Sequence, residues 1–81
     1  MADLGTAKRS QELVKLIMPI LAYEGPDVQS ATLADLLAIW VAGHAPALRE
    51  EILAMHIQFV RDLIPVNEEI LFGEEGHPAE R

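Results

Sequence analysis

The stretch Leu33-Ala34-Asp35-Leu36-Leu37-Ala38-Ile39-Trp40-Val41-Ala42 decides the fold, because Asp35 is its only polar residue. At about 100° per residue its leucines share one broad helical face with Trp40 and Val41. The small side chains that form a strip beside this face are Ala34, Ala38 and Ala42. The stretch is too short to cross a bilayer, which takes roughly 20 apolar residues. We therefore expect a buried helix, with a second helix packed closely against the alanine strip.

Capping residues give the expected limits of this central helix. Ser30 or Thr32 can cap its N-terminus, and Asp35 then lies in the first turn, where a carboxylate is favourable. Gly43 can end it in the left-handed conformation. The preceding Glu24-Gly25-Pro26-Asp27 has the composition of a turn and separates this helix from an earlier one.

Helical spacing also predicts a first helix, which begins at Thr6 or Ser10 and ends near Tyr23. Its apolar residues cover about half of the helix circumference. Pro19 lies inside this segment and cannot donate to the carbonyl of Lys15, at a cost of about 3 kcal/mol in a helix interior. We expect a kink or a break at Pro19.

A third helix is predicted from Pro46 to Ile64, since Pro65 should not continue it. Two apolar seams run along it and together span roughly 200° of its surface. The first seam comprises Leu48, Ile52, Met55, Phe59 and Leu63; the second comprises Leu53, Ile57, Val60 and Ile64. Two seams indicate two neighbours, one from the same chain and one from a second copy.

The remaining segments complete the expected organisation. A short helical extension should run from Asn67 to Phe72 and end at Gly73. We expect a flexible N-terminus at residues 1–5, a single helical domain at 6–72 and a disordered acidic tail at 73–81. The fold class is all-α, a small bundle of three main helices, the first kinked, that oligomerisation completes.

Composition limits the partners. Of the 81 residues, 51% are hydrophobic, more than so short a chain can enclose, and oligomerisation is the usual remedy. Thirteen acidic against six basic residues give a net charge of −7, which disfavours nucleic acid and anionic membrane surfaces. The expected partner is a second copy in a homodimer, or another protein. Residues 1–5 carry no basic region followed by an apolar run, so we expect a cytoplasmic location.

No pattern of catalytic residues is present. The chain has no cysteine, no glycine-rich phosphate loop and no nucleophile-elbow motif. No two histidines are spaced three or four apart, and neither His44 nor His56 follows a glutamate at that spacing, so no metal or cofactor site is predicted. We expect a protein that is not an enzyme and binds no cofactor.

His56 is the residue of greatest interest, because it falls between the two seams with Arg49 on the same side. The simplest interpretation is a histidine packed in a core or interface, while Arg49 pairs with a carboxylate at an interface edge. His44 follows the central helix, where a partly positive ring suits the helix dipole. The residues expected to form an interface or ligand pocket are Ala34, Ala38, Trp40, Arg49, Ile52, His56, Phe59, Val60 and Leu63.

Three functional hypotheses follow. The first is a non-enzymatic helical protein–protein interaction module that self-associates through its apolar helix faces. The second is an acidic inhibitor or antitoxin-like partner, whose C-terminal glutamates at 68–80 occupy a basic site on another protein. The third is a helical bundle that binds a small ligand or a metal at His56. No resemblance to a known family is apparent in these residues.

Overall fold

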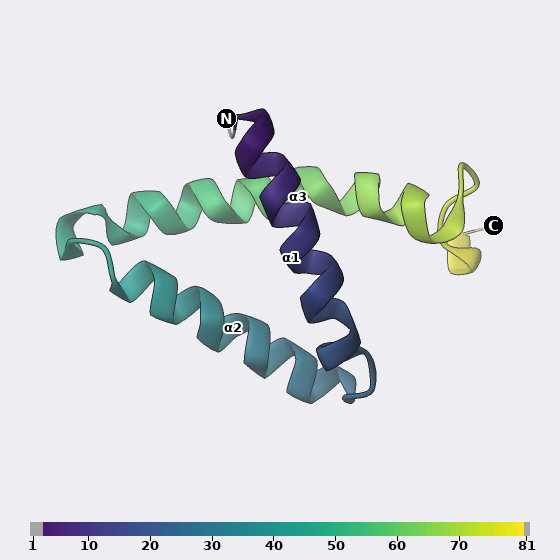
Figure 1. Cartoon of the computed structure of the whole chain (residues 1–81), viewed down its shortest axis with the longest axis horizontal. Helices are drawn as coiled ribbons and strands as arrows, with labels where there is room; N and C mark the ends of the chain where they lie inside the picture. The colour runs from purple at the N-terminus through teal and green to yellow at the C-terminus, as the bar shows by residue number, and fades with distance from the viewer. Residues whose placement is uncertain (1–2, 81) are drawn as a thin grey trace. The chain divides into compact units, whose positions relative to one another are not determined.

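A computed structural model describes residues 3–80 (Figure 1). The chain is 84% helical, with three α-helices and, among the described residues, no strand, which confirms the all-α class. The elements in chain order are α1 (Leu4–Ala22), α2 (Pro26–Ala42), the 3-10 turn η1 (Pro46–Leu48), α3 (Arg49–Phe72) and the 3-10 turn η2 (Pro78–Glu80).

The chain divides into two compact units, Met1–Ala38 and Ile39–Arg81. The boundary lies inside α2. Unit 1 contains α1, the turn after it and most of α2, whereas unit 2 contains the last turn of α2, the corner that follows and α3.

In unit 1, Asp3 determines where α1 begins. Its Oδ1 accepts a 2.7 Å hydrogen bond from the backbone N–H of Thr6, and the N–H of Ala7 donates to its carbonyl. This cap starts the helix at Leu4, so the predicted start at Thr6 is wrong. The helix continues past Pro19 to Ala22, and no break into two pieces occurs.

The turn between α1 and α2 is closed by bonds to Leu21. The N–H of Glu24 and the side-chain amide of Gln29 both donate to the Leu21 carbonyl, at 3.0 and 2.9 Å. Helix α2 already begins at Pro26, so the predicted caps at Ser30 and Thr32 are wrong. Proline fits the first helical position because the donor that it lacks has no acceptor there.

Gly43 ends α2 differently from the prediction. Its N–H donates to the carbonyl of Ile39, and the N–H of His44 donates to that of Val41. Among the described residues a positive φ occurs only at Gly73 and Gly76, so the left-handed conformation expected at Gly43 is wrong. A tightened last turn ends this helix.

Helix α3 passes through Pro65 and reaches Phe72, so the predicted end at Ile64 is wrong. The proline removes a single donor, that of the bond to the Arg61 carbonyl, and the flanking turns are maintained. Asn67 does not cap a new helix; its side-chain amide donates to the carbonyl of Leu63 at 2.9 Å. This bond supports the backbone next to the proline.

Gly73 ends α3 with a φ of 79°, and its N–H donates to the carbonyl of Glu69. A turn and η2 follow it. The ring of His77 lies edge-on to Phe72, with centroids 4.8 Å apart. The structure thus gives residues 74–80 a defined path, and their disorder in solution stays a prediction.

Neither unit contains a buried residue among those described. The presence of a second unit can only reduce the exposure of a side chain. Side chains that are exposed in the whole chain are therefore at least as exposed when their own unit is taken alone. In α2, Leu33, Leu36 and Ile39 are all more than half exposed. The apolar surface of the stretch that decides the fold is therefore not covered within either unit.

Replacing Asp3 by alanine should reduce the helix content of α1, measured by circular dichroism at 222 nm, because the bond to Thr6 is lost. Asp3→Asn keeps an acceptor and is the control. The bond from the Thr6 backbone lowers the pKa of Asp3 from its ordinary 3.8. The stabilisation is therefore fully present above the ordinary pKa of 3.8 and is lost as the pH falls through the lowered pKa. An identical acid response in the asparagine variant would contradict this role.

Candidate functional site

In unit 2, a tight corner connects the last turn of α2 to α3. Residues 43–45 leave α2, and η1 then leads into α3 without a further loop. Pro46 occupies the first position of η1, and the N–H of Leu48 donates to the carbonyl of Ala45 at 2.9 Å. The corner is where unit 2 brings residues of two helices together.

Arg49 ties this corner. Its Nε donates to the carbonyl of His44 at 3.1 Å, and one Nη donates to that of Ala42 at 2.8 Å. The last carbonyls of a helix lack partners within the helix, and a guanidinium both supplies donors and suits the negative end of the helix dipole. Within unit 2 Arg49 thus donates to backbone carbonyls, and its pairing with a carboxylate at an interface edge stays a prediction.

Trp40 lies between two histidine rings at the same corner. Its indole is 4.9 Å from His44 at an interplanar angle of 75°, and 5.1 Å from His56 at 45°. Nδ1 of His44 is 2.9 Å from the Trp40 carbonyl, which can only accept, so this nitrogen carries the proton. His44 thus caps the end of α2, as the sequence predicts. We call Trp40, His44, Arg49 and His56 the corner cluster.

The corner cluster has the chemistry of a packing site. Among the described residues, no group of three or more histidine, aspartate or glutamate side chains is arranged to hold a metal ion. His56 is half-buried and packs against the indole through its ring. Aromatic contacts of this kind, with centroids about 5 Å apart, contribute roughly 1 kcal/mol beyond area burial. The arrangement positions two helix ends.

The structure gathers only some of the predicted site residues. Trp40, Arg49 and His56 meet at the corner, and Ile52 is half-buried in the first turn of α3. Phe59, Val60 and Leu63 lie further along α3 and are exposed. The two predicted residues that belong to unit 1 are Ala34 and Ala38.

His44 belongs to the corner cluster but is not among the predicted site residues. A signal for it was present, because His44 follows Trp40 by four positions and residues at this spacing lie on one side of a helix. The acceptors of Arg49 had no such signal, because they depend on the path of residues 43–45.

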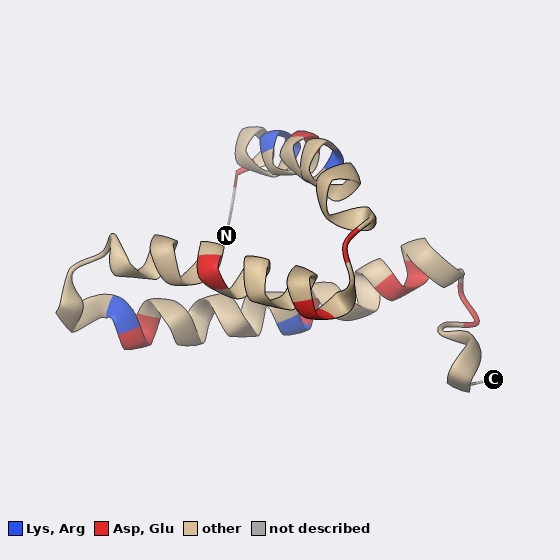
Figure 2. Cartoon of the chain, turned by 90° about the horizontal axis from the view of Figure 1, so that it is seen from below, with Lys and Arg blue, Asp and Glu red and all other residues tan. Residues whose placement is uncertain are grey.

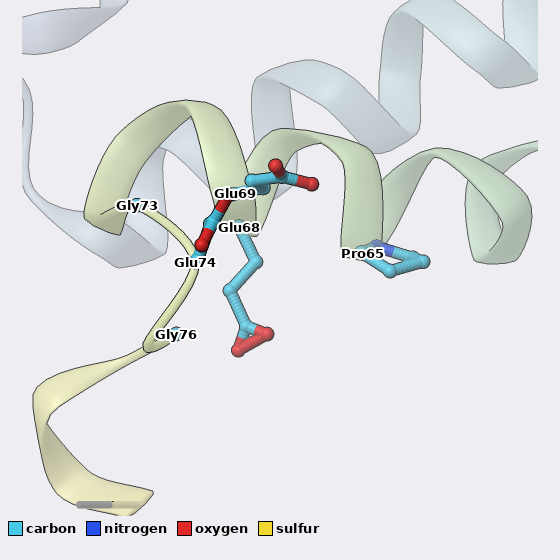
Figure 3. Close-up of a pocket in the computed structure, with 6 residues that line it drawn as sticks. All are labelled: Pro65, Glu68, Glu69, Gly73, Glu74 and Gly76. Carbon is cyan, nitrogen blue, oxygen red and sulfur yellow. The ribbon is translucent and has the colours of Figure 1, made fainter.

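A second feature lies at the end of α3, where an open hollow is rich in carboxylates (Figure 3). It is lined by Pro65, Glu68, Glu69, Gly73, Glu74 and Gly76. Glu68 extends beside the turn that follows α3. The carboxylate of Glu68 lies close to Gly76, since a Cβ at Gly76 would be 3.6 Å from Oε1 of Glu68. This acidic hollow has the charge to attract a basic group.

Comparisons with known proteins give no indication of the function. No protein-family model matches the sequence, and no curated protein or solved structure matches it. Within residues 3–80, none of the helices combines the length and apolar character needed to span a membrane.

Replacing Arg49 by alanine should lower the free energy of unfolding by about 1–2 kcal/mol, because two charge-assisted hydrogen bonds to the corner are lost. Urea denaturation followed by the fluorescence of Trp40 measures this change within the corner cluster. Arg61→Ala, on the exposed side of the same helix, is the matched control and should change stability by less than about 0.5 kcal/mol. Equal losses in the two variants would show that Arg49 does not hold the corner.

Proposed function

We propose that this chain is a non-enzymatic, helical protein–protein interaction module that self-associates through its apolar helix faces as a homodimer. One observation carries the proposal: neither unit encloses a buried residue among those described, and large apolar side chains on all three helices are exposed. Monomeric proteins rarely expose continuous apolar surface on this scale, and such surface is typical of interaction sites.

The exposed area supports a partner of substantial size. The two units, each taken by itself, expose at least 7116 Å². A compact monomer of this mass would expose about 4800 Å², so the two units taken separately expose about 2300 Å² more than that. Obligate dimers bury roughly 1000–2500 Å² on each chain. The surplus therefore matches what a permanent partner covers.

The bend predicted at Pro19 belongs to the same proposal. Proline cannot donate to the carbonyl of Lys15, which weakens α1 on one side. A helix that bends there can follow the surface of a partner. We therefore expect the bend at Pro19 to shape the contact between α1 and a partner in the assembled protein.

The mass in solution tests self-association directly. Light scattering coupled to size exclusion should give about twice 8.9 kDa over a hundredfold range of concentration. Binding of an apolar dye should weaken as the dimer forms, because part of the apolar surface is then covered. A mass of 8.9 kDa throughout, with no dye binding, would reject the proposal.

We propose as a second candidate an acidic partner protein whose C-terminal glutamates occupy a basic site. The acidic hollow favours it, since Glu68, Glu69 and Glu74 line one open depression (Figure 3). Figure 2 shows acidic residues in red on the last part of α3 and in the turn that follows it. Unit 2 as a whole carries more acidic than basic residues, so a cationic partner would be attracted over some distance.

The second candidate predicts that a lysine-rich peptide binds the chain and that neutralising the hollow abolishes binding. The test variant combines Glu68→Gln, Glu69→Gln and Glu74→Gln. The control removes the same number of charges elsewhere on α3, by Glu50→Gln, Glu51→Gln and Asp62→Asn. Titration calorimetry at low salt should show that the peptide binds the wild-type chain and the control variant but not the test variant. Equal weakening of both would show only a response to net charge, and self-association should survive in both variants.

A further inference from the structure

We infer that the second copy docks on the C-terminal half of α3. The docking surface, which we call the distal seam, consists of Phe59, Leu63, Val66 and Ile70, with Val60, Ile64 and Leu71 along one edge. The inference rests on the proposed self-association and names the surface that carries it.

The distal seam is the second half of a heptad pattern. Arg49, His56, Leu63 and Ile70 are spaced seven apart, and Ile52, Phe59 and Val66 each follow by three. This 3-4 spacing is the one that brings side chains into the seam between two paired helices. It continues over the whole of α3, from its first turn to its last.

The first half of the pattern is already occupied within unit 2. Arg49 donates to the end of α2, and His56 packs against Trp40. Among the described residues of unit 2, the second half makes no ring contact and no side-chain hydrogen bond to another element. Phe59, Val66 and Ile70 are at least 55%, 52% and 74% exposed. The change from occupied to exposed falls between His56 and Phe59.

Polarity separates the two halves in the same way. The first half includes a guanidinium and an imidazole, which are costly in a helix–helix core unless partners satisfy them. Every residue of the distal seam is apolar. The neighbouring Asn67 donates to the Leu63 carbonyl of its own helix, so this amide does not require a partner across the contact. The distal seam can therefore be dehydrated without leaving a charge unpaired.

The area of the distal seam also suits a dimer. Its seven residues, of roughly 200 Å² each and about half exposed, present about 700 Å², close to the ~800 Å² per partner of a standard interface. The alanine strip of α2 presents only methyl groups. Helix α2 is apolar on nearly every side, so it offers no single face with polar edges. The observations therefore favour α3 over α2 as the contact.

Three single-aspartate variants test the inference by light scattering. Val66→Asp places a charge in the distal seam. Leu36→Asp is the matched control on α2, since Leu36 is 54% exposed and Val66 is 52% exposed. Ala54→Asp controls for the added charge on the exposed side of α3. Val66→Asp should raise the dissociation constant of the dimer by about 100-fold or more, and the other two by less than about 5-fold.

Circular dichroism and the fluorescence of Trp40, which lies in the corner cluster, establish that each variant folds. A dimer that survives in Val66→Asp but dissociates in Leu36→Asp overturns the inference and leaves self-association standing. Equal effects of Val66→Asp and Ala54→Asp overturn it as well. A wild-type chain that stays monomeric refutes the proposed function itself, so the two failures are distinguishable.

Discussion

The bonds from Arg49 to the end of α2 are the interaction on which the arrangement within unit 2 depends. One guanidinium, at the first position of α3, satisfies the carbonyl of Ala42 at the end of α2 and that of His44 in the corner. Because this side chain holds the corner, Trp40 comes within reach of His56 on the next helix. Because of these bonds, the guanidinium charge of Arg49 has hydrogen-bond acceptors although the residue lies on the apolar side of α3. The ordered contacts of α3 within unit 2 are therefore concentrated at its first two turns.

The helical class and the apolar seams could be read from the sequence, because a period of 3.6 residues persists over long segments. Helix boundaries were less predictable. Asp3 and Pro26 are both good start signals, but stronger-looking candidates follow each of them within a few positions. Pro65 was expected to end α3, yet the loss of one donor does not outweigh the turns on either side.

The site was predictable in part. His56 and Arg49 were singled out because they lie on the apolar side of a helix, and helical spacing alone shows that. The acceptors of Arg49 could not be inferred, since a backbone carbonyl has no signature in the sequence. The exposure of Phe59 and Leu63 could not be inferred either, because periodicity identifies an apolar face without showing what covers it.

The lack of a core in either unit has a consequence for folding. The bonds that close the turn and the corner join residues close together in the chain; Gln29 and Leu21 are eight apart, and Arg49 and Ala42 seven. Such local contacts form quickly, because little loop entropy is lost, but each contributes little free energy. In the dimer that we propose, the covered apolar faces would supply free energy that these local contacts lack, so the free energy of unfolding would rise with the concentration of the chain.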